Sequence, residues 1–266
     1  REVTVALSGD GGDELFLGYD RYAMAERVEK TFRNVPAGLR VAGAAIASLI
    51  PNYRLRMVAE GLKYKGDKDL YASVFIGWNR RFVQRLLRQG GDSEPRFERD
   101  YFHRLLNRGR HLPLVEQAAF ADLQHYLPND VMTKVDRASM HYSLESRAPM
   151  LDHRLVEFAL QLPLHLKMRG GSQKIILKDM LREVLPPHLL NRPKAGFAVP
   201  LRHWFRGKLK PMMRDLLAPS ELREHGLFNE QFVQELIRDH LSGKWNFERQ
   251  LWALIVFQLW YRAQKQ

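Results

Sequence analysis

The sequence predicts an α/β fold in which one strand precedes a mass of helices, and three observations indicate this class. The apolar run Val3 to Leu7 has the composition of a strand. A glycine-rich turn follows immediately, at residues 8–12. Beyond it, apolar side chains recur every three or four positions, which is the period of a helix. One strand ahead of many helices is typical of the later part of an α/β domain, so we expect most of the sheet to precede Arg1 and the chain to begin inside a fold.

The first half of the chain is expected to hold three helices and a linker. The apolar spacing predicts helices from Asp13 to about Glu29, from Pro36 to about Ile50 and from Leu70 to about Arg88. The clearest linker is Gly-Gly-Asp-Ser-Glu-Pro at residues 90–95, because glycine and proline interrupt regular structure.

Four further helices are expected beyond the linker, and prolines separate them. Their ranges are residues 97–107, 114–126, 130–144 and 151–162. Proline ends or kinks a helix near the preceding residue. Pro128, Pro149 and Pro163 therefore mark the expected boundaries.

The last third is expected to be helical except for one loop. Residues 172–185 form an amphipathic pattern, with Ser172 as the cap and Pro186 as the stop. Residues 191–207, rich in Pro and Gly, predict an ordered loop that leads into a helix. The tail, residues 229–264, predicts two helices, and we expect its aromatic side chains to be core residues. Those aromatics are Trp252, Phe257 and Trp260.

Composition limits the class of protein. The chain has 266 residues, 45% hydrophobic and 27% charged, which suffices for one large domain or two small ones. It has no cysteine, so a disulfide framework and a thiolate nucleophile are excluded, and we expect a reducing, cytoplasmic setting. Residues 41–50 and 251–260 are the most apolar segments, each about half of the roughly 20 residues that cross a bilayer. We expect no membrane span.

The net charge of +12 and the pI near 10.0 raise the question of nucleic-acid binding. The arginines are dispersed, however, and no Lys/Arg-rich run or aromatic-interleaved motif occurs. We therefore expect no nucleic-acid partner, and a basic surface that faces either solvent or an acidic partner domain.

The glycine-rich turn has two interpretations. A strand, a glycine turn and a helix start form an anion site, because glycines permit close backbone approach and free N–H groups point outward. Gly9, Gly11 and Gly12 supply such a turn. Asp13 and Glu14, however, are also what an ordinary helix start prefers, since acidic groups are stabilised by the helix dipole. The residues alone leave both interpretations open.

The loop carries three carboxylates, Asp10, Asp13 and Glu14, and no lysine. The three negative charges would repel a phosphate placed beside them. Magnesium resolves the conflict, because it binds through one or two carboxylates together with substrate phosphates. In this interpretation Ser8 and Gly9 contact the α-phosphate region of a nucleotide, Asp13 binds the metal, and Asp10 faces the reacting centre.

Three stretches together resemble the synthetase domain of glutamine-dependent asparagine synthetases. They are "SGDGGDELFLGY" at 8–19, "KVDRASMHYSLESRAPMLDHRLVEFALQLP" at 134–163, and "KIILKDMLREVLP" with "RPKAGFAVPL" within 174–201. They occur in the expected order, and the resemblance covers residues 3–210. It departs at Leu17, where the family usually has a small residue.

This resemblance implies that residues 1–266 are the C-terminal, mostly helical portion of a synthetase domain of the adenine-nucleotide alpha hydrolase-like, ATP-pyrophosphatase type. It implies an ATP- and Mg²⁺-dependent ligase in amino-acid biosynthesis that converts aspartate to asparagine. The aspartate side-chain carboxylate attacks the α-phosphorus of ATP, pyrophosphate leaves, and ammonia displaces AMP from β-aspartyl-AMP.

In the family, ammonia comes from glutamine, through an N-terminal glutaminase domain with a cysteine nucleophile. Because this chain has no cysteine, we expect that domain, and the first nucleotide loop, to lie upstream. The 266 residues alone are then expected to be inactive. The glutaminase domain is an expected partner, and a homodimer is left open.

Site residues follow from the resemblance by position. Lys174 and Asp10 are implied as catalytic, and Asp13 as the magnesium ligand. The implied nucleotide-binding residues are Ser8, Gly9, Gly11 and Gly12. Glu14 lies in the same motif, with a substrate or structural role.

Lys174 also has a simpler interpretation. Lys174, Lys178 and Arg182 are spaced by four, which indicates a solvated basic helix face. A lysine in a first helical turn is nevertheless disfavoured by the helix dipole, so an anionic neighbour or ligand would explain its position.

Residues 145–153 surround a proline turn and allow two roles. Glu145, Arg147, Asp152 and His153 could form a buried ion-pair network that fixes the corner. Alternatively, Arg147 could bind a substrate carboxylate through its two-pronged guanidinium. For residues 192–200, substrate cover and simple packing are equally compatible.

The sequence is also compatible with two other functions. Enzymes with the same nucleotide motifs adenylate other carboxylates, such as sugar, peptide or β-lactam precursors, because a fold does not fix a substrate. A non-catalytic basic binding module is the alternative from a different class.

Overall fold

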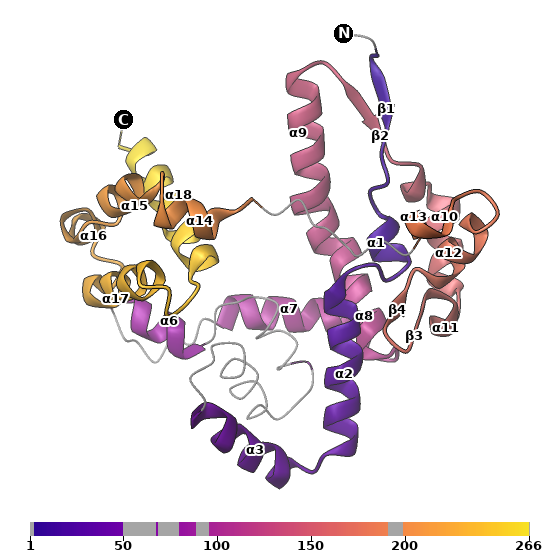
Figure 1. Ribbon diagram of the computed structural model, residues 1–266, viewed down its shortest axis with the longest axis horizontal. Helices are drawn as coiled ribbons and strands as arrows, with labels where there is room; N and C mark the ends of the chain where they lie inside the picture. Colours follow the sequence, from indigo (N-terminus) through magenta and orange to yellow (C-terminus); the bar gives the residue numbers. More distant parts are fainter. Residues whose placement is uncertain (1–2, 50–67, 69–79, 89–95, 191–198, 266) are drawn as a thin grey trace. The chain divides into compact units, whose positions relative to one another are not determined.

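The computed structural model describes residues 3–49, 68, 80–88, 96–190 and 199–265 (Figure 1). The chain divides into two compact units, each built from separate stretches of sequence. Unit 1 comprises Arg1–Gly43, Leu62–Ala72 and Arg99–Lys194, and unit 2 comprises Ala44–Gly61, Ser73–Glu98 and Ala195–Gln266. Most described residues lie in helices, and strands are few and short, as the sequence predicts. None of the described helices has the length and apolar character needed to cross a bilayer.

The elements up to residue 141 are β1 (Val5–Leu7), α1 (Gly12–Leu15), α2 (Asp20–Asn34), α3 (Ala37–Leu49), α6 (Arg80–Leu86), α7 (Arg96–Arg108), α8 (Leu114–Ala121), the π-helix η1 (Asp122–Met132) and α9 (Thr133–His141). Next come β2 (Glu145–Arg147), the 3₁₀ turn η2 (Pro149–Leu151), α10 (His153–Gln161), α11 (Leu164–Lys167), β3 (Met168–Arg169), β4 (Ser172–Gln173), α12 (Ile175–Leu181) and α13 (Pro187–Leu190). The last are α14 (Leu201–Arg206), α15 (Lys210–Leu216), α16 (Pro219–His225), α17 (Glu230–Leu241) and α18 (Glu248–Ala263).

In unit 1, the opening strand pairs with a segment far along the chain. β1 and β2 run parallel, with Val5 opposite Glu145 and Leu7 opposite Arg147 (Figure 1). The strand begins two residues later than expected, at Val5. This pairing places the loop after β1 beside the turn after β2, because parallel strands end at the same edge.

The expected helix from Asp13 to Glu29 is wrong, because the chain breaks at residues 16–19. α1 ends at Leu15 and α2 begins at Asp20. Between them, Leu17 has φ 57°, in the left-handed region that cannot continue a right-handed helix. Leu17 is 1% exposed, so burial of its side chain holds this conformation. The turn closes through a hydrogen bond from Gly18 N–H to the Asp13 carbonyl, at 2.8 Å.

The expected break at Pro128 is also wrong. α8, η1 and α9 form one continuous helical run, and Pro128 lies inside its π-helical section. In an α-helix a proline ring clashes with the carbonyl four residues earlier, and the wider turn of a π-helix relieves this clash. Thr133 Oγ1 donates to the Pro128 carbonyl at 2.8 Å, which satisfies an acceptor there. Pro149 and Pro163, in contrast, do lie at boundaries, at the start of η2 and just before α11.

The expected helix at residues 172–185 begins later than predicted. Ser172 belongs to β4, which pairs with β3 as a short antiparallel hairpin, so Ser172 is not the helix cap. Gly170 and Gly171 form its turn with φ 59° and 83°, values that glycine adopts without strain. α12 therefore runs only from Ile175 to Leu181, and Lys174 occupies its N-cap position.

Several expected helices agree with the structure. The helices expected at residues 36–50, 97–107 and 151–162 correspond to α3, α7 and α10. For the one expected at 70–88, α6 is the part that the structure describes. The linker expected at 90–95 lies outside the described residues.

Unit 2 is a helical cluster around an apolar core. Phe205, Met213, Val233 and Leu251 are each 0% exposed within it. The two expected tail helices are present as α17 and α18.

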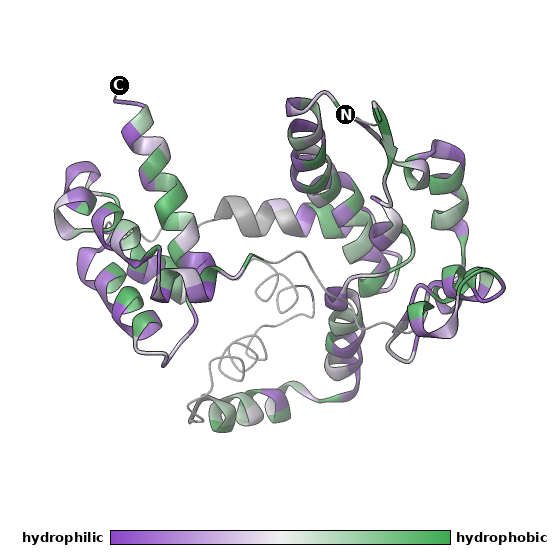
Figure 2. Ribbon diagram, turned by 45° about the horizontal axis from the view of Figure 1, so that its top comes forward, coloured by the Kyte–Doolittle hydropathy of each residue, from purple (hydrophilic) through white to green (hydrophobic). Residues whose placement is uncertain are grey.

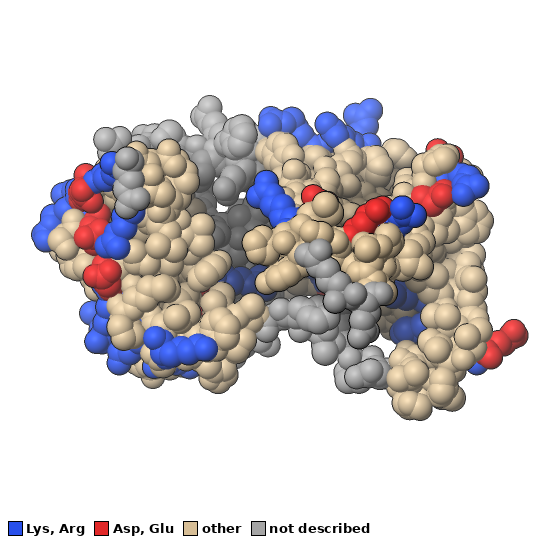
Figure 3. All heavy atoms as spheres, turned by 90° about the horizontal axis from the view of Figure 1, so that it is seen from above, with Lys and Arg blue, Asp and Glu red and all other residues tan. Residues whose placement is uncertain are grey.

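The expectation that the tail aromatics are core residues is wrong for both tryptophans. Trp252 and Trp260 are 41% and 56% exposed, while Phe257 packs against Phe228 with ring centroids 5.0 Å apart. The apolar residues of α18 are not confined to one side of the helix, so the helical period did not identify the buried face; Figure 2 shows polar and apolar residues mixed along it. On the face drawn in Figure 3, Lys and Arg side chains are interspersed with Asp and Glu.

Candidate active site

The loop after β1 starts with an exposed backbone. Ser8 N–H continues the strand pairing by donating to the Arg147 carbonyl at 2.8 Å, and Ser8 Oγ donates to Asp10 Oδ2 at 2.8 Å. Gly9 is exposed, and a Cβ at this position would meet no atom within 4 Å. The space above Gly9 is therefore open to a ligand that approaches the backbone closely.

Gly11 and Gly12 lie on the buried side of the same loop. Gly11 has φ 88°, and a Cβ there would overlap the side chain of Leu151. Gly12 opens α1, and its N–H donates to the Gly9 carbonyl at 3.2 Å. Packing under η2 already requires glycine at position 11, so the predicted nucleotide role of these two residues rests on the family resemblance.

Asp13 and Lys174 form the central contact of the site. Lys174 Nζ lies 2.6 Å from Asp13 Oδ1, and the side chains are 36% and 25% exposed. The lysine therefore has the anionic neighbour that its position near a helix start calls for. It is not in the first turn of α12, as expected, but is the N-cap residue, with φ 55°. A Cβ on Gly18 would overlap both Asp13 Oδ1 and Lys174 Cε, so this pair requires glycine at position 18.

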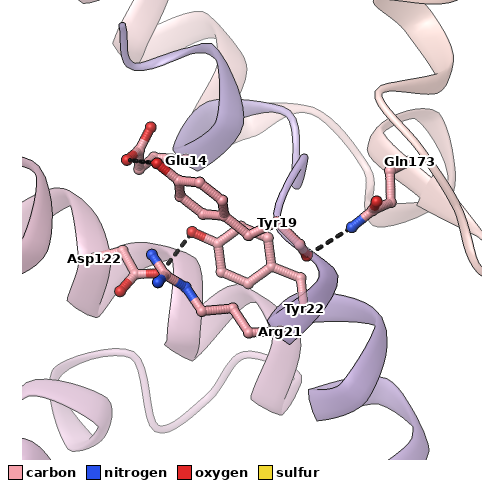
Figure 4. Close-up of polar contacts among 6 residues, drawn as sticks. All are labelled: Glu14, Tyr19, Arg21, Tyr22, Asp122 and Gln173. Atoms are coloured by element: carbon pink, nitrogen blue, oxygen red, sulfur yellow. Dashed lines mark hydrogen bonds and ion pairs between the residues drawn. The ribbon is translucent and has the colours of Figure 1, made fainter. Parts of the chain in front are cut away.

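Glu14 points away from solvent. It is 2% exposed and accepts a hydrogen bond from the Tyr19 hydroxyl at 2.8 Å (Figure 4). Burial raises the pKa of Glu14, and the Tyr19 hydrogen bond opposes the rise. Burial and the nearby Glu14 carboxylate likewise raise the pKa of Tyr19. Glu14 also lines a cavity of about 40 Å³ beside the ion pair of Lys167 with Glu116, in which Nζ and Oε1 are 2.8 Å apart. Its surroundings favour a structural role.

An ion pair between the half-buried Arg21 and the buried Asp122 lies at the start of α2 (Figure 4). Arg21 Nε donates to Asp122 Oδ2 at 2.9 Å, and the Tyr22 hydroxyl donates to the same oxygen at 2.6 Å. The Arg21 guanidinium carbon lies 4.1 Å from the ring centroid of Tyr19 and 4.4 Å from that of Tyr126. Asp122 is 3% exposed, and burial raises its pKa to about 6 against the opposing effect of Arg21.

Sequence reasoning missed this network. Asp122 gave a signal, since a carboxylate at the end of an apolar helix needs a partner when the helix is buried. Its partner Arg21 is far away in the sequence, so that signal could not identify it.

The expected buried ion-pair network at residues 145–153 is wrong, because its members are solvent-exposed. Arg147 Nε donates to Glu145 Oε1 at 2.7 Å, with side chains 64% and 53% exposed. Asp152 caps α10 by accepting from Arg154 N–H at 2.9 Å, and it pairs with the Arg154 side chain. Arg154 holds the pKa of Asp152 well below its usual range. His153 is exposed beside Asp152.

The predicted magnesium site can be tested against the donor set. Among the residues that the structure describes, no three His, Asp or Glu side chains come together as a metal-binding cluster. One accessible carboxylate, Asp13, lies at the ion pair with Lys174. This donor set fits a magnesium ion held by one carboxylate and by nucleotide phosphates, and does not fit an ion held by protein alone. Of the loop predicted at 192–200, residues 192–198 lie outside the described part of the chain.

Comparison with known proteins finds one family model and several curated relatives. The asparagine synthase family model matches residues 1–262. The chain is 29% identical over 263 residues to asparagine synthetase [glutamine-hydrolyzing] 1 of Bacillus subtilis, covering 98% of this chain and 40% of the relative. It is 24% identical to asparagine synthetase [glutamine-hydrolyzing] 3 of the same organism, covering 91% and 34%. It is 21% identical to the amidase chyE of Penicillium rubens, covering 88% and 38%.

The chain thus spans about two-fifths of the length of the curated relatives that it matches, or less. No solved structure matches it significantly.

Proposed function

This chain belongs to the asparagine synthase family, and we propose that it supplies the adenylating site of an ATP-dependent ligase that converts aspartate to asparagine. The observation that carries the proposal is the contact of Lys174 Nζ with Asp13 Oδ1, at 2.6 Å, beside an exposed glycine turn. A cation, a carboxylate and open backbone are the groups that bind and activate a nucleoside triphosphate.

The first half-reaction uses the loop. A carboxylate oxygen of aspartate attacks the α-phosphorus of ATP, and pyrophosphate leaves with the electron pair of the broken P–O bond. Ser8 and Gly9 bind the adenylate through backbone and hydroxyl groups, and Asp13 is the carboxylate available to magnesium. Magnesium, when bound, neutralises phosphate charge. Lys174 contributes a fixed ammonium to the developing charge on the phosphates.

The second half-reaction uses the same lysine. Ammonia attacks the acyl carbon of β-aspartyl-AMP, and AMP leaves with one oxygen of the original carboxylate. Lys174 stabilises the oxyanion of the tetrahedral state. Asp10, which already accepts from Ser8 Oγ at 2.8 Å, faces the reacting centre and takes a proton from the attacking nitrogen.

Glutamine is the proposed nitrogen source. The relatives named above as asparagine synthetases carry the words glutamine-hydrolyzing, and this chain covers less than half of each. A glutaminase domain in the full-length protein would deliver the ammonia, in the cytoplasm.

The experiment is ATP–pyrophosphate exchange by the full-length protein with a panel of carboxylates. We expect exchange to require aspartate, and asparagine to accumulate with either glutamine or ammonium. Exchange with a different carboxylate, and none with aspartate, would move the function to another adenylating enzyme with the same loop. The chain also has relatives of other names, such as the amidase chyE at 21% identity, so the panel includes carboxylates other than aspartate.

A further inference from the structure

Lys174 directly follows the β3–β4 hairpin, and this hairpin is held in place by a buried side chain. β3 and β4 pair with Met168 opposite Gln173, and Met168 is 3% exposed, so an apolar anchor holds the first strand. The second strand leads directly into Lys174, which adopts φ 55°. Lysine rarely adopts this left-handed conformation, and it persists only where surrounding contacts impose it.

Two adjacent residues make those contacts with the backbone between α1 and α2. Gln173 Nε2 donates to the Tyr19 carbonyl at 2.6 Å (Figure 4), and Lys174 N–H donates to the Phe16 carbonyl at 3.2 Å. The two acceptors flank Leu17 and Gly18. The hairpin is therefore hydrogen-bonded to both sides of Gly18. Glycine at this position leaves space for the ion pair, since a Cβ there would overlap both Asp13 and Lys174.

Of these two contacts, the one made by the Gln173 side chain can be removed by a substitution that leaves both members of the ion pair unchanged. The Lys174 contact uses a main-chain N–H, whereas Gln173 uses its amide. Losing the amide removes one of these two hydrogen bonds, so that the contact of Lys174 N–H with the Phe16 carbonyl holds the backbone with less support.

We propose that Gln173 is a positioning residue, which fixes the Lys174 backbone against the 16–19 turn so that the lysine ammonium stays on Asp13. The hydrogen bonds of Gln173 and Lys174 are observed in the structure, whereas their effect on catalysis rests on the proposed function. Displacing a catalytic group by about 1 Å can lower a rate by roughly 100-fold.

The test compares Gln173→Met with Gln234→Met in the full-length protein. Gln234 is a matched control, because its Nε2 also donates to a backbone carbonyl, that of Leu217 at 2.8 Å, but in unit 2. The first readout is the acetylation rate of Lys174 by acetic anhydride relative to Lys178, measured by mass spectrometry. We expect about a fivefold rise in Gln173→Met, the equivalent of one typical hydrogen bond, and none in the control.

The second readout is the kcat of aspartate-dependent exchange. We expect it to fall about 10- to 100-fold in Gln173→Met with the KM for ATP little changed, and to stay at the wild-type value in Gln234→Met. An unchanged Lys174 acetylation rate in Gln173→Met overturns the proposal. If the wild type shows no exchange with any carboxylate, the proposed function fails, and acetylation alone decides the role of Gln173.

A second variant keeps the proposal testable if Gln173→Met does not fold. Gly18→Ala places a methyl group where the ion pair lies, whereas Gly43→Ala places one in open space. We expect faster Lys174 acetylation in the first and the wild-type rate in the second. Equal rates in both would mean that displacing the ion pair does not expose Lys174, and the proposal would fall because it requires the 16–19 turn to hold the lysine on Asp13.

Discussion

Unit 2 and the loop of unit 1 hold their side chains by different forces. In unit 2, fourteen buried apolar residues form one cluster, and burial of apolar surface has no directional preference. In unit 1, the residues around Lys174 are fixed by single contacts with defined donors and acceptors, such as Gln173 with Tyr19. The difference teaches that stability and atomic position have separate sources in this chain, so substitutions should separate them.

The largest expected effect is on stability, in unit 2. Phe205 is 0% exposed, and Phe205→Ala should lower the free energy of unfolding by about 3–5 kcal/mol, because a cavity replaces the ring. Trp260→Ala is the control, since Trp260 is 56% exposed and should cost less than about 1 kcal/mol. Urea unfolding measures both, and equal losses would mean that Trp260 is buried in the full-length protein.

The next effect is on catalysis, in unit 1. Lys174→Met should lower the aspartate-dependent exchange rate by about 10²–10³, because it removes the fixed ammonium. Lys178→Met, one turn further along α12, should stay within about twofold of the wild type. The steady-state kinetics of both variants, with their melting temperatures, make the comparison. Similar losses in the two variants would mean that Lys174 has no specific catalytic role and belongs to a solvated basic helix face.

The third effect is the pH dependence of stability, which tests the network formed by Asp122 with Arg21 and Tyr22. Burial raises the pKa of Asp122 from 3.8 to about 6, so the folded chain binds this proton more tightly than the unfolded chain does. The contribution of this group to stability is complete below about pH 4 and is lost as the pH rises through 6, by about 3 kcal/mol. Urea unfolding between pH 4 and 7 should show this loss in the wild type relative to Asp122→Asn. Parallel pH profiles for the two proteins would contradict it.

The smallest expected effect is at Arg147. Its pair with Glu145 is exposed, so Arg147→Met should change the free energy of unfolding by less than about 1 kcal/mol. We expect the KM for aspartate to stay at the wild-type value if the pair is only structural. A tenfold rise in this KM with unchanged stability would show instead that Arg147 binds the substrate carboxylate.

The sequence predicted features that local residues determine. The strand, the glycine turn and the start of α1 follow from residues that adjoin one another, and so do the two tail helices. The pairing of Asp13 with Lys174 confirms an anionic neighbour for the lysine.

Features that depend on distant partners were not predictable. Leu17 breaks a well-patterned helix because its side chain is buried, and Lys174 takes a left-handed conformation because Phe16 and Asp13 hold it. In α18, Gln258 is 1% exposed and Trp260 is 56% exposed, which reverses what their polarity predicts. An apolar pattern that is not confined to one side of a helix does not specify which side is buried.

The central claim is that this loop serves carboxylate adenylation, and an isotope measurement tests it most directly. The full-length protein is given aspartate labelled with ¹⁸O in its side-chain carboxylate, with ATP and ammonium, and the products are examined by mass spectrometry. We expect one ¹⁸O atom in AMP, because the attacking carboxylate oxygen stays on the α-phosphorus when AMP leaves. Label in inorganic phosphate together with ADP would contradict it, since the attack would then have occurred at the γ-phosphorus.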